Sequence, residues 1–415
     1  MSIFSSEQEM QDWLESKFSE IWGLSDIISN NNYIEDFVPK NLSEEKIRDS
    51  FKISYECLHL LELITANQNI SSKKGEILKP DLITYSPEKE TIVLIELKNF
   101  SGATREAGTE ISAYSAELKG ALQSLPDGDI VSVIISPHWP TLIKHYIYNT
   151  IVFQSKNLLC LEPCLTDGEI SLKIVDIPLL VQSSLPERYN DHQLAGYTLC
   201  LYDDTQQQHN PPPTKLHEYI QVMLSSMDVI SAKGEKINGH GFALLSKEIR
   251  GFGLSPYFIS VVNVAPFKCL EQVLHLEGIN NYSDLPLATQ KYFDIYLEHS
   301  PHGYGSSLSS ICQASFPILK TICDPHIEGL TTWDEINRNI EQNWQPMYFV
   351  SWGIFKDMSV ALLTEEYKIG NTSNNLNSVS LGYKVISQLV NKEYNYIEIS
   401  HINESFFPTG YFDPE

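Results

Sequence analysis

The sequence predicts an α/β protein with a mixed sheet flanked by helices in its N-terminal domain and an α+β domain of unknown fold after it. Two helical patterns come first, and short apolar runs then alternate with further helical ones in the order α-α-β-β-α-β-α-β, as in a mixed sheet covered by helices. The 415 residues exceed one typical domain. Hydrophobic residues make up 42% of the chain, which is enough to build buried cores.

The first two elements are predicted as helices from the period of their apolar residues. Ser6–Trp22 can be capped by Ser5 or Ser6, and Ser43–Asn67 begins with Ser-Glu-Glu, a typical helix start. Each segment carries an apolar stripe at helical spacing: Met10, Leu14, Phe18 and Ile21 in the first, and Ile47, Phe51, Leu58 and Leu61 in the second.

The period then changes to that of strands. Lys79–Tyr85 and Thr91–Asn99 flank a turn at Ser86–Glu90 and are predicted to form a hairpin. The remaining elements of this domain are predicted as a helix, a buried strand, a second helix and a final strand: Thr104–Leu122, Asp129–Ser136, Trp139–Asn149 and Asn157–Glu162.

Two polar segments, Gln182–His192 and the Gln- and Pro-rich Asp203–Thr214, are candidate domain boundaries. We predict domains at residues 1–190 and 191–415. In the second we expect strands at Tyr257–Val264 and Met347–Phe355 and helices at Leu285–Glu298, Ser306–Ile322, Trp333–Asn343 and Ser380–Asn391. This half carries no strong chemical motif.

The charge balance restricts the class of partner. The chain has 29 basic and 53 acidic residues, a net charge of −24. Phosphate binding normally rests on Lys and Arg, so this balance works against a broad nucleic-acid surface. Any such surface must be a local basic patch or come from a partner subunit.

Cysteine usage and the N-terminus favour an intracellular protein. The seven Cys are scattered, and the one close pair, Cys160 and Cys164, has no second Cys or His pair at zinc-site spacing, so free thiols in a reducing compartment are expected. The N-terminus lacks the basic and apolar regions of a signal peptide, and no apolar run approaches the ~20 residues that cross a bilayer. We expect a soluble, cytoplasmic protein without a membrane partner.

The hairpin carries the residues that suggest chemistry. Asp81 lies on its first strand, and Glu96 and Lys98 lie two apart on its second, so that both point to one face. Burying a carboxylate and an ammonium on an apolar strand is costly unless they are paired or bind a metal. Asp81, Glu96 and the backbone carbonyl of Leu97 are candidate ligands for a hard cation such as Mg²⁺. Lys98 can orient or deprotonate a water, or stabilise phosphate charge.

This arrangement resembles the PD-(D/E)XK nuclease superfamily, in which Pro80-Asp81 and Glu96-Leu97-Lys98 form the motif. The resemblance covers about Ser5 to Cys164 in element order and only the hairpin in residue detail. It implies a nuclease-type α/β core, Mg²⁺ or Mn²⁺, and hydrolysis of nucleic-acid phosphodiester bonds, with DNA favoured over RNA. Many members of the family act in restriction, repair or phage defence.

The family also suggests accessory residues. A Glu from an upstream helix often joins the site, and here Glu62 and Glu7 are the two candidates. Some relatives carry a Gln-x-x-x-Tyr motif on the helix after the hairpin. In this chain Glu110 stands at the Gln position, four residues before Tyr114.

Three other interpretations stay open. Glu96 and Lys98 can form a plain salt bridge on one face of an edge strand. The domain can keep the nuclease fold and act without cleavage, through a protein partner or as a homo-oligomer. The C-terminal half can also sense a ligand or protein and gate the nuclease.

Overall fold

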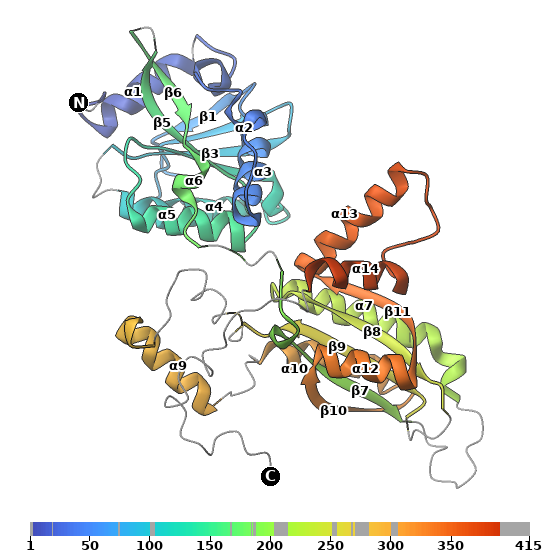
Figure 1. Cartoon of the computed structure of the whole chain (residues 1–415). Coiled ribbons are helices and arrows are strands. Elements are labelled where there is room, and N and C mark those ends of the chain that lie inside the picture. Colours follow the sequence, from blue (N-terminus) through green and yellow to red (C-terminus); the bar gives the residue numbers. More distant parts are fainter. Residues whose placement is uncertain are drawn as a thin grey trace. The chain divides into compact units, whose positions relative to one another are not determined.

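The chain divides into two compact units, Met1–Leu185 and Pro186–Glu415 (Figure 1). The division between the units falls inside Gln182–His192, one of the two segments predicted as a domain boundary. The computed structural model describes residues 3–18, 20–73, 75–99, 104–166, 168–183, 185, 188–202, 215–250, 255–266, 269, 282–299 and 306–390. The predicted loop at Asp203–Thr214 lies outside these ranges.

The first unit is built on six strands with helices before and between them. The strands are β1 (Glu62–Ala66), β2 (Leu82–Ser86), β3 (Thr91–Leu97), β4 (Ile130–Ile135), β5 (Leu158–Thr166) and β6 (Glu169–Ile174). The longer helices are α1 (Glu7–Phe18), α3 (Leu42–Glu56), α4 (Thr104–Ala121) and α5 (Thr141–Tyr148), and the single turns are Leu24–Ile27, α2 (Tyr33–Asp36), Asp127–Asp129, Asn149–Phe153 and α6 (Ile177–Leu180).

The strands form one mixed sheet in the order β1-β2-β3-β4-β5-β6. The two central pairs, β3 with β4 and β4 with β5, are parallel, and the outer pairs are antiparallel. This confirms the predicted mixed sheet flanked by helices and the predicted hairpin of β2 and β3. The nuclease-type identity of the sheet stays a prediction.

One predicted helix is wrong in its second half. The helix expected over Ser43–Asn67 ends at Glu56, and Glu62–Ala66 forms β1, antiparallel to β2. Ile64 and Thr65 are β-branched and favour a strand. Hydrogen bonding to the edge of β2 then stabilises this segment as a strand. Leu58 and Leu61 are buried as the stripe predicted, but they lie in the connection after the helix.

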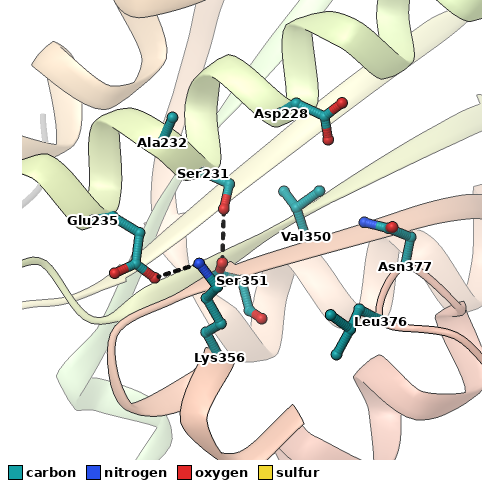
Figure 2. A pocket seen from close by; sticks show the side chains of 9 residues that line it. All are labelled: Asp228, Ser231, Ala232, Glu235, Val350, Ser351, Lys356, Leu376 and Asn377. Atoms are coloured by element: carbon teal, nitrogen blue, oxygen red, sulfur yellow. Dashed lines mark hydrogen bonds and ion pairs between the residues drawn. The ribbon is translucent and has the colours of Figure 1, made fainter. Parts of the chain in front are cut away.

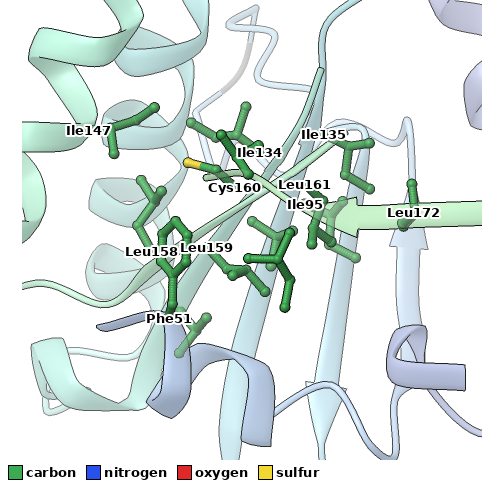
Figure 3. Close-up of a cluster of buried hydrophobic side chains, with 14 of the residues drawn as sticks. Phe51, Ile95, Ile134, Ile135, Ile147, Leu158, Leu159, Cys160, Leu161 and Leu172 are labelled. Carbon is green, nitrogen blue, oxygen red and sulfur yellow. The ribbon is translucent and has the colours of Figure 1, made fainter. Parts of the chain in front are cut away.

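The apolar side chains of β3 fall into two clusters according to the face on which they lie. Val93, Ile95 and Leu97 belong to the same core as Phe51 of α3, which Figure 3 shows beside the central strands. Ile92 and Leu94, on the opposite face, cluster with Tyr114 of α4. Successive side chains of a strand alternate between faces, so Glu96 and Lys98 continue the face covered by α4.

The second unit is an antiparallel sheet between two helical layers, in the order β10-β7-β9-β8-β11. One face packs against α7 and α10, and the other against α12, α13 and α14. The strands are β7 (Leu194–Tyr202), β8 (Gly241–Glu248), β9 (Tyr257–Val264), β10 (Asp324–Thr332) and β11 (Trp344–Trp352). The helices are α7 (Ile220–Lys236), α9 (Leu287–His299), α10 (Ser307–Ala314), α11 (Phe316–Leu319), α12 (Trp333–Asn343), α13 (Ile354–Lys368) and α14 (Val379–Leu389), with short turns at Asp191–Gln193, Lys215–Tyr219 and Tyr282–Asp284.

The sequence predicted this unit less completely. The strand at Tyr257–Val264 and the helix at Trp333–Asn343 have the predicted bounds, whereas β7, β8 and β10 were not predicted. Among the described residues, no helix is both long and apolar enough to span a membrane.

Candidate active site

Asp81 and Glu96 face each other across the β2–β3 hairpin. Leu82 pairs with Ile95 at the end of the ladder, so the next position along the register sets Asp81 opposite Glu96. Side chains directly opposite in an antiparallel pair lie on the same face. The backbone N–H of Leu97 donates a hydrogen bond of 2.7 Å to Asp81 Oδ2. Asp81 lies just before β2, so the hairpin backbone fixes its carboxylate beside Glu96.

Lys98 lies at the centre of a group of carboxylates. Its Nζ lies 2.6 Å from Glu96 Oε1, 2.8 Å from Glu110 Oε2 and 3.7 Å from Glu7 Oε1. Glu96 and Lys98 are 2% and 5% exposed. The structure therefore brings the predicted Glu96 and Lys98 together in close, buried contact, and adds one carboxyl group from α1 and one from α4.

The pKa values of Asp81, Glu96 and Lys98 are all shifted from their ordinary values. Burial raises the pKa of Asp81 and of Glu96, and each of these two is raised further by neighbouring carboxylates. Burial opposes charge on Lys98, but the Glu96 and Glu110 carboxylates outweigh it and raise the pKa of that ammonium. Lys98 is therefore charged, and Glu96 is the group whose ionisation costs most.

One oxygen of Glu96 is not satisfied by the protein. Glu96 Oε2 is buried, and none of the described residues donates a hydrogen bond to it. Its carboxyl group also contacts the Glu110 carboxyl group, and a hydrogen bond between the two requires a proton on one of them. A buried oxygen without a donor is costly, and a cation would remove that cost. Asp81, Glu96 and the Leu97 carbonyl thus fit the oxygen ligands that Mg²⁺ or Mn²⁺ takes in proteins. Within the described ranges, no three His, Cys, Asp or Glu side chains are arranged to hold one ion.

The two candidates for the upstream carboxylate are separated by the structure. Glu7 lies on α1 and reaches Lys98. Glu62 is not on a helix: it begins β1 and is exposed. The N–H of Asn67, just past the far end of β1, donates to the Asp81 carbonyl at 2.9 Å, so Glu62 lies at the end of β1 away from Asp81. The prediction that Glu62 supplies a helical carboxylate to the site is wrong.

The helix after the hairpin contributes two residues. Glu110 of α4 pairs with Lys98, and Tyr114, one turn later, donates a hydrogen bond of 3.0 Å from its hydroxyl to the Lys79 carbonyl. Tyr114 is 6% exposed. It therefore ties α4 to the segment that carries Asp81. Sequence reasoning did not place Glu110 in the site, although its position four residues before Tyr114 was the available signal.

The second unit contains a separate open cavity of about 280 Å³ between α7, β11, α13 and the segment before α14 (Figure 2). Its polar groups mostly bond to the protein itself: Ser231 donates to the Ser351 carbonyl at 2.8 Å, and Glu235 pairs with Lys356 at 3.4 Å. Asn377 donates to the Phe349 carbonyl at 3.1 Å. These contacts join the surrounding elements, and the buried carboxylate group of the first unit is the stronger functional candidate.

Comparisons with protein-family models, curated proteins and solved structures gave no significant match. The assignment of function therefore rests on the geometry of the site.

Proposed function

We propose that the first unit is a divalent-metal-dependent nuclease of the PD-(D/E)XK type. The observation that carries this proposal is the placement of Asp81 directly opposite Glu96, with the Lys98 ammonium 2.6 Å from Glu96. Two carboxylates and a lysine on one buried face, at the end of the central strands of a mixed sheet, are the donor and charge set that phosphodiester hydrolysis needs.

Each residue has a defined role in the proposed site. Asp81 and Glu96, with the Leu97 carbonyl, would hold Mg²⁺ or Mn²⁺. The bound cation would neutralise charge on the phosphate and lower the pKa of a coordinated water. Lys98 presents a permanent positive charge at the same face, where it can orient the attacking water and stabilise the phosphate. The Leu97 N–H keeps the Asp81 carboxylate in place.

The test is a cleavage assay on DNA and RNA substrates with Mg²⁺ or Mn²⁺, comparing the wild-type chain with Asp81→Ala and Lys98→Ala. The wild-type chain is expected to cut, DNA in preference to RNA, and both variants to lose at least about a hundredfold in rate, as when a charge-stabilising group is removed. Unchanged activity in both variants would overturn the proposal.

The charge of the chain favours a second candidate function. With a net charge of −24, and with Glu7, Glu96 and Glu110 around Lys98, the site repels free nucleic acid in the absence of cations. A protein that keeps the fold and acts through a protein partner or as a homo-oligomer, without cleavage, is consistent with this charge. Calorimetry distinguishes the two: Mn²⁺ binding that Glu96→Ala abolishes argues against a purely structural role.

The wider setting follows from the nuclease proposal. A cytoplasmic enzyme with a guarded site, acting on a restricted nucleic-acid substrate or with a protein partner, fits the acidic composition better than a free, unspecific DNA-cutting enzyme. A role in bacterial anti-phage defence is part of this proposal and rests on the family resemblance alone.

A further inference from the structure

We propose that Glu110 is a positioning residue that retains the Lys98 ammonium when Glu96 turns to a divalent cation. This inference rests on the proposed metal site. It concerns a carboxylate on α4 at a position where the resemblance offers a neutral Gln side chain.

The geometry gives the Lys98 ammonium two close carboxyl groups. Its Nζ lies 2.6 Å from Glu96 Oε1 and 2.8 Å from Glu110 Oε2. The lysine is 5% exposed, so water cannot replace a lost partner. A buried ammonium without a counter-ion is strongly destabilising. Lys98 therefore needs at least one of these carboxylates in every state of the site.

Cation binding at Glu96 changes how the two carboxyl groups act on Lys98. A divalent ion on the Glu96 carboxylate repels an ammonium a few ångströms away. With Glu110 present, Lys98 keeps a counter-ion at its existing position. With a neutral side chain there, the remaining partner in the described cluster is Glu7, at 3.7 Å and with its side chain 35% exposed. The cost of a poorly paired Lys98 would then appear as weaker metal affinity.

Glu110 is assigned to Lys98 and not to the metal for two reasons. Its Oε2 already lies 2.8 Å from the Lys98 Nζ, at ion-pair distance. Among the described residues, no three Asp, Glu, His or Cys side chains are arranged to hold one metal ion, so Glu110 does not complete such a set with Asp81 and Glu96. A residue that acts through Lys98 should lose its influence on metal binding when Lys98 is absent, whereas a direct ligand should keep it.

The experiment is a double-mutant cycle read by calorimetric titration of the full chain with Mn²⁺. The four proteins are the wild type, Glu110→Gln, Lys98→Met, and both substitutions together. Glu110→Gln alone is expected to weaken Mn²⁺ binding about tenfold, as is usual when a residue that supports a metal ligand is lost. In the Lys98→Met background the same substitution should change affinity less than about threefold.

The controls separate this inference from the proposed function. Glu106→Gln removes an exposed carboxylate one turn earlier on α4 and should leave the affinity unchanged. Failure of the wild type to bind Mn²⁺, or equal binding by Glu96→Gln, would overturn the metal site itself. With that site intact, wild-type affinity in Glu110→Gln, or equal weakening in both Lys98 backgrounds, would overturn the role of Glu110 alone. If Glu110→Gln does not fold, Glu110→Asp keeps the charge and shortens its reach, and the same cycle applies.

Discussion

Glu7 Oε1 lies 3.7 Å from Lys98 Nζ, which joins the first helix of the chain to the end of β3. This contact makes Glu7 the upstream carboxylate of the candidate site. In the proposed nuclease, Glu7→Gln should lower the cleavage rate about tenfold, because a support of Lys98 is lost. Glu62→Gln is the matched control and should change nothing, since Glu62 is exposed on β1. A rate that falls for Glu62→Gln and not for Glu7→Gln would reverse the assignment.

The buried Glu96 makes stability depend on pH. Burial and the Asp81 charge raise the pKa of Glu96 to about 9, against roughly 4.3 in an unfolded chain. Between these values the folded state binds more protons than the unfolded state, so the free energy of unfolding should fall as pH rises. At a pH below the pKa of Glu96 in the unfolded chain, the stabilising contribution of this residue to the free energy of unfolding is fully present. Asp81, whose pKa is raised to about 6 by burial, acts in the same direction.

Urea unfolding with a chelator, at about pH 5, 7 and 9, measures this dependence. Glu96→Gln should flatten it, because the amide does not titrate. In a parallel series with Mn²⁺ in place of the chelator, the cation should stabilise the wild type most at high pH, since it binds the ionised carboxylate. If the free energy of unfolding changes equally with pH in the wild type and in Glu96→Gln, groups other than Glu96 set this pH dependence.

Two substitutions of Asp81 separate its charge from its hydrogen bond. Asp81→Asn keeps an oxygen that can accept from the Leu97 N–H, which now donates over 2.7 Å. It also removes a buried charge, so stability should be retained while Mn²⁺ binding is lost. Asp81→Ala also removes the acceptor and should cost about 1–3 kcal/mol of unfolding free energy. Thermal unfolding and calorimetry of both variants check this, and equal stability of the two would mean that water replaces the lost acceptor.

The hairpin was predictable because its signal is local. Alternation, a turn and an apolar run fix β2 and β3, and the two-residue spacing fixes the shared face of Glu96 and Lys98. The choice between Glu7 and Glu62 was not predictable, because it depends on where α1 packs and on β1 pairing with β2, and both are tertiary events. Ser43–Asn67 shows the same limit, since its apolar spacing suits a helix throughout and sheet pairing overrides that spacing after Glu56.

The independence of the two units can be tested at Gly234 of α7. A Cβ at this position would overlap the indole ring of Trp352. That ring is fully buried and its Nε1–H donates to Asn263 Oδ1 at 2.8 Å, so it cannot shift without breaking a buried hydrogen bond. Gly234→Ala should therefore destabilise the second unit by about 1–3 kcal/mol through overpacking.

The site in the first unit should not respond to Gly234→Ala, because Asp81, Glu96 and Lys98 are held by contacts within that unit. Differential scanning calorimetry should show a lower unfolding temperature for the second unit. Titration with Mn²⁺ below that temperature should give the wild-type affinity. Gly120→Ala is the control in the first unit: a Cβ there meets no neighbour, and Ala in place of a helical Gly should stabilise by about 0.4–1 kcal/mol. If Gly234→Ala changes Mn²⁺ affinity while both units remain folded, the second unit acts on the site, and the gating interpretation gains direct support.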